Sequence, residues 1–264
     1  MPATVPRRTR PGAGRPPGAQ AIVRGNALHR HSYWLFGVFA LAMVVAFWPS
    51  YFSRLGSQPS YHFHAHGLAM TAWAVLLVTQ AWLMRTGQRV THKRLGRLSY
   101  VVAPLVVITT IHFAHFGVQV VPVLDPVSLY FLTLVLNALV AFSLLFGLAM
   151  YYRRQPALHA RYMIATLFPL FTPVTDRLIG RFIPALVPIV PRIEGAPIVP
   201  VAGFLLADAM LAALAVWDWR VNRRADAFPV ALAIVVLYHV SVMSFYRLPA
   251  WIDFGNWFVG LPLS

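Results

Sequence analysis

The fold is decided by residues 61–104, which read YHFHAHGLAMTAWAVLLVTQAWLMRTGQRVTHKRLGRLSYVVAP. A histidine-rich start leads into a long apolar run, a basic turn follows, and a second apolar run begins. A run of about 20 apolar residues is long enough to cross the hydrocarbon core of a bilayer as a helix. This stretch therefore predicts two membrane helices joined by a basic turn at one membrane face.

The composition of the whole chain indicates the same class. Of 264 residues, 59% are hydrophobic and 11% are charged. Open sheet is excluded in lipid because its edges leave backbone groups without partners, and nothing alternates as barrel strands do. The chain has no cysteine, which excludes disulfides, thiolate metal sites and covalently attached haem. We therefore expect an all-α integral membrane bundle of about seven transmembrane helices.

The net charge of +15 is concentrated in a few segments. Clustered cations often bind nucleic acid, but the positions here follow the positive-inside rule instead. The N-terminus is then inside and the C-terminus outside, in a bacterial inner membrane, and the partners are the bilayer and anionic lipid headgroups rather than nucleic acid. The four segments expected at the cytosolic face hold 17 of the 22 Lys and Arg: 1–31, 85–97, 152–161 and 219–228.

The apolar runs also predict how the chain is divided. We expect a disordered basic tail over residues 1–31, a seven-helix domain over 32–247 and a short outer interfacial segment over 248–264. The expected spans are 33–51, 67–84, 98–119, 127–151, 162–183, 199–217 and 229–245.

The fifth expected span contains two prolines, Pro169 and Pro173, just before Asp176 and Arg177. Each proline leaves a carbonyl without its usual donor, so we expect a kink. Free carbonyls beside a carboxylate suit a cation or solute site, whereas a bend alone is the commoner result of proline in a membrane helix. The proline-rich loop 184–200 that follows is expected to form a lid, a re-entrant segment or a linker.

Histidines gather where the second and third spans reach the outer face. At about 1.5 Å per residue, His66, His112 and His115 reach similar depth. Neutral imidazoles on facing helices would bind a divalent metal or take the axial positions of a b-type haem. The candidate metal ligands are His62, His64 and His66. The alternative is a set of hydrogen-bonded histidines that line a polar outer cavity.

Other ionisable residues lie inside the expected spans, where they are costly and often functional. Asp176 and Arg177 are expected near the outer face, and Asp208 and His239 nearer the midplane. We expect a proton relay, or support for a cofactor ligand, from this set. A buried ion pair that locks two helices is the alternative.

The third and fifth spans begin with the same motif. His92-Lys-Arg94 and His159-Ala-Arg161 both read H-x-R, at expected cytosolic helix entrances. His92 and His159 would ligate an inner haem, or they would bond to neighbouring backbone carbonyls while the arginines contact lipid phosphate.

These motifs carry two resemblances. The QAWLMR sequence that ends the second span, HKRLGR at 92–97 and HARYM at 159–163 resemble uncharacterised bacterial multi-pass membrane proteins, a domain of unknown function, over residues 61–182. That resemblance implies the topology and no activity. The chain also resembles transmembrane b-type cytochromes of the ascorbate-reducing kind, which would imply haem ligation by His66, His92 and His159. The fourth span has no histidine, so an outer haem would need His112, His115 or His239.

The sequence therefore favours a redox-type or metal-handling membrane protein, with His66 and His112 or His115 as ligands of haem b or a divalent metal. A transporter or binding protein for a small solute, built on the kinked fifth span, is the alternative. An assembly factor without catalytic activity is the third. No phosphate loop, dinucleotide turn or serine triad is present, so any catalysis would be cofactor chemistry.

Overall fold

The computed structural model describes residues 17–121 and 124–263, with side chains from residue 31 onward. In these residues the fold is all-α apart from one short hairpin. The helices are α1 Pro17–Phe47, α2 Tyr61–Arg85, α3 Arg89–Gly96, α4 Ser99–Gln119, α5 Pro126–Tyr151, α6 Pro156–Ala165, α7 Thr172–Phe182, α8 Pro200–Asn222, α9 Phe228–Phe245 and α10 Pro249–Val259. Single 3-10 turns cover Phe52–Ser57, Phe168–Leu170 and Pro184–Ile189.

Six helical stretches in the described residues are long and apolar enough to cross a membrane. Many of their large apolar side chains are exposed on the outside of the bundle, as expected for helices that face lipid. The chain therefore has the character of a multi-pass membrane protein. The six stretches are His31–Ser57, Tyr61–Arg85, Arg89–Gln119, Pro126–Tyr151, Pro200–Asn222 and Phe228–Phe245.

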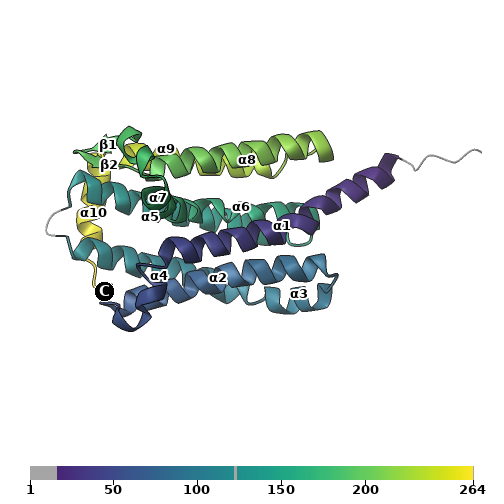
Figure 1. Cartoon of the computed structure of the whole chain (residues 1–264), viewed down its shortest axis with the longest axis horizontal. Helices are drawn as coiled ribbons and strands as arrows, with labels where there is room; N and C mark the ends of the chain where they lie inside the picture. Colours follow the sequence, from purple (N-terminus) through teal and green to yellow (C-terminus); the bar gives the residue numbers. More distant parts are fainter. Residues whose placement is uncertain (1–16, 122–123, 264) are drawn as a thin grey trace, which may run out of the picture.

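The long helices lie side by side along the long axis of the molecule (Figure 1). Neighbours around the bundle follow the order α1, α2, α4, α5, α9, α8 and α7, and α7 returns to α1. The short helix α10 crosses one end of the bundle, where it contacts α4 and α5. The predicted interfacial segment 248–264 contains this helix.

The fifth expected span, 162–183, is not one helix. Helix α6 ends at Ala165, a 3-10 turn follows at Phe168–Leu170, and α7 begins at Thr172. Pro169 lies in the turn and Pro173 in the first turn of α7, where a missing N–H costs no helical hydrogen bond. The prolines therefore break the helix completely, a larger effect than the predicted kink.

This broken segment lies in the core of the bundle. Nearly every residue from 161 to 175 is buried, and the segment contacts α1, α5, α8 and α9. Helix α8 approaches α7 closely because residue 203 is glycine: a Cβ atom there would lie 2.3 Å from Oγ1 of Thr175. Protein surrounds this segment, whereas lipid faces much of the six long stretches.

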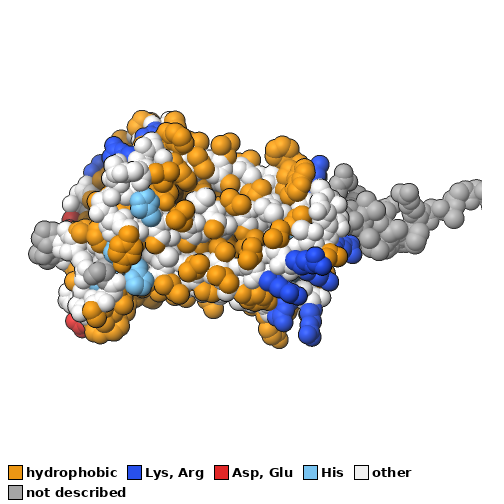
Figure 2. Space-filling model, turned by 90° about the horizontal axis from the view of Figure 1, so that it is seen from below, with side chains coloured by type: hydrophobic (Ala, Val, Ile, Leu, Met, Phe, Trp, Pro, Cys, Tyr) orange, Lys and Arg blue, Asp and Glu red, His pale blue; other side chains and the backbone are white. Residues whose placement is uncertain are grey.

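The two ends of the bundle differ in charge. Figure 2 shows Lys and Arg side chains gathered at the end that carries α3, and histidine side chains toward the opposite end. We call these the basic end and the histidine end. Short turns connect the described helices at the basic end, whereas the histidine end carries α10 and the loop 184–200.

The proline-rich loop 184–200 is ordered on the histidine end. It forms the 3-10 turn Pro184–Ile189 and an antiparallel hairpin of β1 Arg192–Ile193 and β2 Ala196–Pro197, paired Arg192 with Pro197 and Ile193 with Ala196. Ile193 and Ile198 are buried, so the loop packs on the bundle rather than crossing it again. Helix α1 begins at Pro17, inside the segment 1–31 that was predicted to be a disordered tail, and residues 1–16 lie outside the described part of the chain.

Helix α5 shows how local sequence sets a boundary. Asp125 caps its start, because Oδ1 accepts a hydrogen bond from the backbone N–H of Ser128 at 2.7 Å, and Pro126 follows as the first helical residue. The bond from Ser128 lowers the pKa of Asp125. This cap fixes the depth of the residues that α5 contributes to the core.

Candidate functional site

Four buried polar atoms without a hydrogen-bond partner lie on the broken segment and on helices α5 and α9 that pack against it. They are Oη of Tyr130 on α5, Oγ1 of Thr172 on α7, and Oη of Tyr238 and Nε2 of His239 on α9. All four residues are buried, and none is more than 4% exposed. Since buried polar groups are nearly always hydrogen-bonded, such a set marks a place where a ligand or water completes the structure.

These groups are close to one another. Tyr130 and Tyr238 interact electrostatically with each other and with Asp176. The hydroxyls of Tyr238 and Thr172 also lie close enough to interact, although their geometry is not that of a hydrogen bond. Thr172 and Asp176 are four residues apart and share one face of α7. The break before α7 therefore places Thr172, in its first turn, near Tyr238 of α9, and a polar cluster forms.

Asp176 and Arg177 are neighbours and form an ion pair. The Arg177 guanidinium lies 3.2 Å from Oδ1 of Asp176 and 4.4 Å from the centre of the Phe47 ring. The guanidinium also donates to the carbonyl of Pro173 at 2.8 Å. Asp176 therefore carries a partner of opposite charge.

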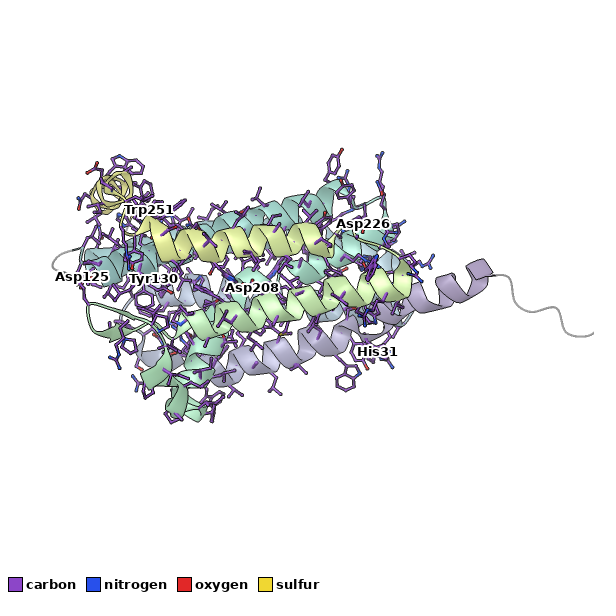
Figure 3. All side chains as sticks on the ribbon, turned by 90° about the horizontal axis from the view of Figure 1, so that it is seen from above. His31, Asp125, Tyr130, Asp208, Asp226 and Trp251 are labelled. Carbon is purple, nitrogen blue, oxygen red and sulfur yellow. The ribbon has the colours of Figure 1, made fainter. Side chains whose placement is uncertain are left out.

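Asp208 and His239 form a second pair. Nδ1 of His239 lies 3.0 Å from Oδ1 and 3.1 Å from Oδ2 of Asp208, and the ring of Phe204 stacks on the imidazole at 4.2 Å. Asp208 lies about midway along the bundle (Figure 3), as its place in the sixth expected span predicts. Because a carboxylate accepts, Nδ1 carries the proton, which leaves Nε2 of His239 as an acceptor when the ring is neutral.

Phe204 also connects this pair to the polar cluster. Its ring lies 5.9 Å from the ring of Tyr238 and 4.2 Å from the imidazole of His239, and these two rings are 4.7 Å apart. We refer to Tyr130, Thr172, Asp176, Tyr238, His239 and Asp208 as the central polar site.

The three candidate metal ligands of α2 do not converge. His62 bonds through Nδ1 to Oγ of Ser60 at 2.6 Å, His64 faces the Tyr51 ring at 6.0 Å, and His66 bonds through Nδ1 to Oγ1 of Thr110 at 3.1 Å. Residues two apart on a helix point in different directions, so the H-x-H-x-H run cannot present three imidazoles to one ion. Among the described residues, no group of three His, Asp or Glu side chains is arranged to hold a metal ion.

His112 and His115 are covered by the C-terminal segment. Nδ1 of His112 lies 2.7 Å from the carbonyl oxygen of Leu263, and the fully buried His115 meets the Phe258 ring edge at 5.2 Å. Both interact electrostatically with His62, whereas the ring of His66 stacks on Phe113 at 5.0 Å. The predicted pairing of His66 with His112 or His115 is therefore not what the packing favours.

The inner histidines bond within their own hairpins. Nδ1 of His159 lies 2.8 Å from the carbonyl of Ala149. With its amide oriented to donate, Gln80 lies 2.6 Å from Nδ1 of His92 and accepts from the N–H of Gly96 at 3.2 Å. Each histidine thus ties a turn at the basic end to the helix before it. The partner of His159 is a backbone carbonyl, whereas the partner of the His92 ring is the Gln80 side chain.

Arg161 does not contact lipid headgroups, contrary to prediction. It is 3% exposed and forms a bidentate pair with Asp218 of α8, with Nε at 2.7 Å from Oδ2 and Nη2 at 2.6 Å from Oδ1. The amide of Asn222 donates to the same carboxylate at 2.7 Å. Asp218 falls just outside the expected sixth span, 199–217, so it was not among the candidate residues.

The three hydroxyls of the central polar site also escaped the sequence analysis, because Tyr130, Thr172 and Tyr238 carry no charge. Two signals were available: the Tyr238-His239 dipeptide within an apolar span, and Thr172 beside the two prolines.

The chain matches no protein-family model, no curated protein and no solved structure. The resemblances to bacterial membrane proteins of unknown function and to b-type cytochromes therefore find no counterpart in these comparisons. What the sequence and the fold identify together is an all-helical protein with six candidate membrane spans and a buried polar site around a broken helix.

Proposed function

We propose that the protein binds a small polar solute inside its helical bundle, as a membrane transporter or solute-binding protein. The observation that carries this proposal is the set of buried polar atoms without partners on Tyr130, Thr172, Tyr238 and His239. A bound solute with several hydrogen-bonding groups would satisfy these atoms. Without a ligand, each buried and unpaired atom would cost about 1–3 kcal/mol of stability.

The broken segment supports the same function. Pro169 and Pro173 cannot donate to the carbonyls of the residues four positions earlier, Ala165 and Pro169. Irregular backbone at membrane depth is tolerated where protein or a polar cavity surrounds it, and broken helices line the solute sites of many transporters. Here helices α1, α5, α8 and α9 pack around the broken segment.

The charges of the site indicate the chemistry of the solute. Arg177 pairs with Asp176, whereas Asp208 pairs with His239 and forms no ion pair with a Lys or Arg among the described residues. The Asp208 side therefore favours a positively charged group. We expect a solute that bears an amine or hydroxyl groups.

The redox or metal function is less well supported. His62, His66 and His112 each bond through Nδ1 to a nearby hydroxyl or backbone carbonyl, and the described histidines and carboxylates form no cluster of three. A spectrum of the purified protein separates the two functions, since a haem protein would show a Soret band that a solute-binding protein lacks.

The experiment is a thermal-shift screen of the protein in lipid nanodiscs with amines, amino acids, polyols and sugars. A ligand at about 100 times its Kd stabilises the folded state by about 2.7 kcal/mol. That corresponds to a rise in Tm of about 5–10 °C for a chain of this size. We expect Thr172→Val, with an affinity about tenfold lower, to reduce the shift caused by the best solute to about half.

The matched control is Thr133→Val. Thr133 is also fully buried, but its hydroxyl already donates to the carbonyl of Leu129 at 2.6 Å, so it has no bond to offer a solute. Thr133→Val should keep the shift. The proposal fails if no solute stabilises the protein, or if both variants respond as the wild type does.

A further inference from the structure

We propose that an anionic phospholipid occupies a groove between α4 and α5, with its phosphate on arginines of the basic end and an acyl chain in the groove. The inference is independent of the central polar site, which lies on other faces of the bundle helices.

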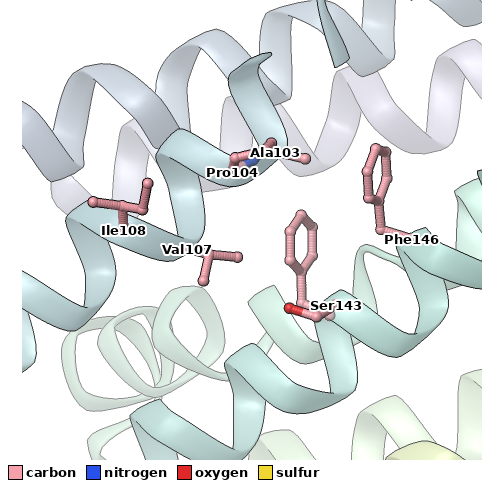
Figure 4. A pocket seen from close by; sticks show the side chains of 7 residues that line it. Ala103, Pro104, Val107, Ile108, Ser143 and Phe146 are labelled. Carbon is pink, nitrogen blue, oxygen red and sulfur yellow. The ribbon is translucent and has the colours of Figure 1, made fainter. Parts of the chain in front are cut away.

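The groove is apolar and open to the outside of the bundle (Figure 4). It has a volume of about 250 Å³ and is lined on α4 by residues from Ala103 to Ile108 and on α5 by Phe142, Ser143 and Phe146. Pro104, Ile108 and Ser143 are exposed, so the groove faces the hydrocarbon region of the membrane. Its chemistry suits an acyl chain.

Arginines lie at the end of the groove nearest the basic end. Arg97 precedes Ala103 by six residues, about 9 Å along a helix, and Arg153 follows Phe146 by seven residues, about 10 Å. Arg97, Arg153 and Arg154 are exposed, and within the described part of the chain none of them forms an ion pair with a carboxylate. Arg153 donates to the carbonyl of Met150 at 3.2 Å in its own turn.

The arginines and the apolar groove lie where a single phospholipid molecule would contact both. The arginines lie just before α4 and just after α5, the two helices that form the groove. A phospholipid has a phosphate at one end and apolar chains that run into the bilayer, so both parts of the surface are covered by a single ligand. A free phosphate ion would leave the groove empty, and a neutral lipid chain would leave the arginines unpaired.

The test is competitive lipid retention. The full-length protein is reconstituted with equal amounts of phosphatidylglycerol and phosphatidylcholine, transferred to detergent, and the lipids that stay bound are counted by native mass spectrometry. We expect one phosphatidylglycerol per chain to be retained in preference to phosphatidylcholine. Each basic residue near the surface contributes about fivefold to such a preference, so Arg97→Gln with Arg154→Gln should reduce it about 25-fold.

Two further variants make the result specific. Arg220→Gln with Arg223→Gln removes the same charge at the end of α8, which does not border the groove, and should leave the preference unchanged. Ser143→Phe fills the groove and should reduce retention while all the arginines remain. Equal retention of the two lipids would overturn the proposal, as would an equal effect of the two arginine pairs or retention unaffected by Ser143→Phe.

Discussion

Replacing Tyr238 with phenylalanine should stabilise the solute-free protein. The change removes one hydroxyl and leaves the ring, whose contacts with Phe204 at 5.9 Å and His239 at 4.7 Å are retained. The hydroxyl is buried without a hydrogen-bond partner. Most point mutations of buried residues destabilise, so a gain is a distinctive result.

The magnitude follows from the cost of an unsatisfied buried hydroxyl. Leaving such a group without a partner costs about 1–3 kcal/mol, and the phenylalanine variant recovers that cost. For a chain of this length, about 1 kcal/mol corresponds to a rise in Tm of about 2–4 °C. Thermal unfolding of the protein in nanodiscs, followed by the fluorescence of its eight tryptophans, measures this shift.

The matched control is Tyr246→Phe on the same helix. Tyr246 is also 4% exposed, but its hydroxyl accepts a hydrogen bond from Nε of Arg247 at 2.7 Å. Removing a satisfied hydroxyl should lower stability by about 0.5–1.5 kcal/mol. If Tyr238→Phe lowers Tm as much as Tyr246→Phe does, the Tyr238 hydroxyl is satisfied in the folded protein and the reasoning that places a solute there is refuted.

Three other predictions follow from the ionisable groups. Asp218→Ala leaves Arg161 buried and unpaired, so it should lower the stability measured by thermal unfolding by about 3–5 kcal/mol. Asp218→Leu combined with Arg161→Met should recover most of that loss. A double variant as unstable as the single variant would contradict this account. Partial burial opposes ionisation of Asp226, but the hydrogen bond and charge of Arg224 outweigh it and lower the pKa of Asp226. A carboxyl whose pKa is lowered by folding stabilises the fold at pH values above its unfolded pKa of about 3.9, and this stabilisation is lost as the pH falls through its folded pKa. The Tm difference between wild type and Asp226→Asn should therefore shrink below about pH 4. A difference that is constant from about pH 6 to about pH 3 would contradict this prediction. Asp208→Asn removes a negative charge from the site, so it should reduce the thermal shift caused by an amine more than the shift caused by a neutral polyol, and equal effects on the two shifts would contradict this.

The sequence predicted most of the membrane helices because long apolar runs have few other structures available. Each of the six candidate spans overlaps one of the expected spans. The fifth expected span differs because an apolar run does not reveal whether lipid or protein covers it. Pro169 and Pro173 indicated a local distortion, but the central position of the segment depends on the packing of α1, α5, α8 and α9 around it.

The candidate site was predictable only where charge made residues conspicuous. Asp208 and His239 were expected at similar depth on the sixth and seventh spans, and the structure pairs them at 3.0 Å. The histidine run at 62–66 suggested one shared site, yet helix geometry turns the three rings toward different neighbours. The hydroxyls of Thr172 and Tyr238 gave only weak signals, because an uncharged polar residue in a span is common and its lack of a partner is visible only in three dimensions.

The most direct test of the account is equilibrium binding of a labelled solute, chosen as the one with the largest thermal shift, to nanodiscs that hold the wild type, Thr172→Val or Thr133→Val. The account predicts saturable binding of one solute per chain to the wild type and to Thr133→Val, and an affinity about tenfold lower for Thr172→Val, since one hydrogen bond in a buried site contributes about 1.4 kcal/mol. Binding of equal affinity to all three proteins would contradict it.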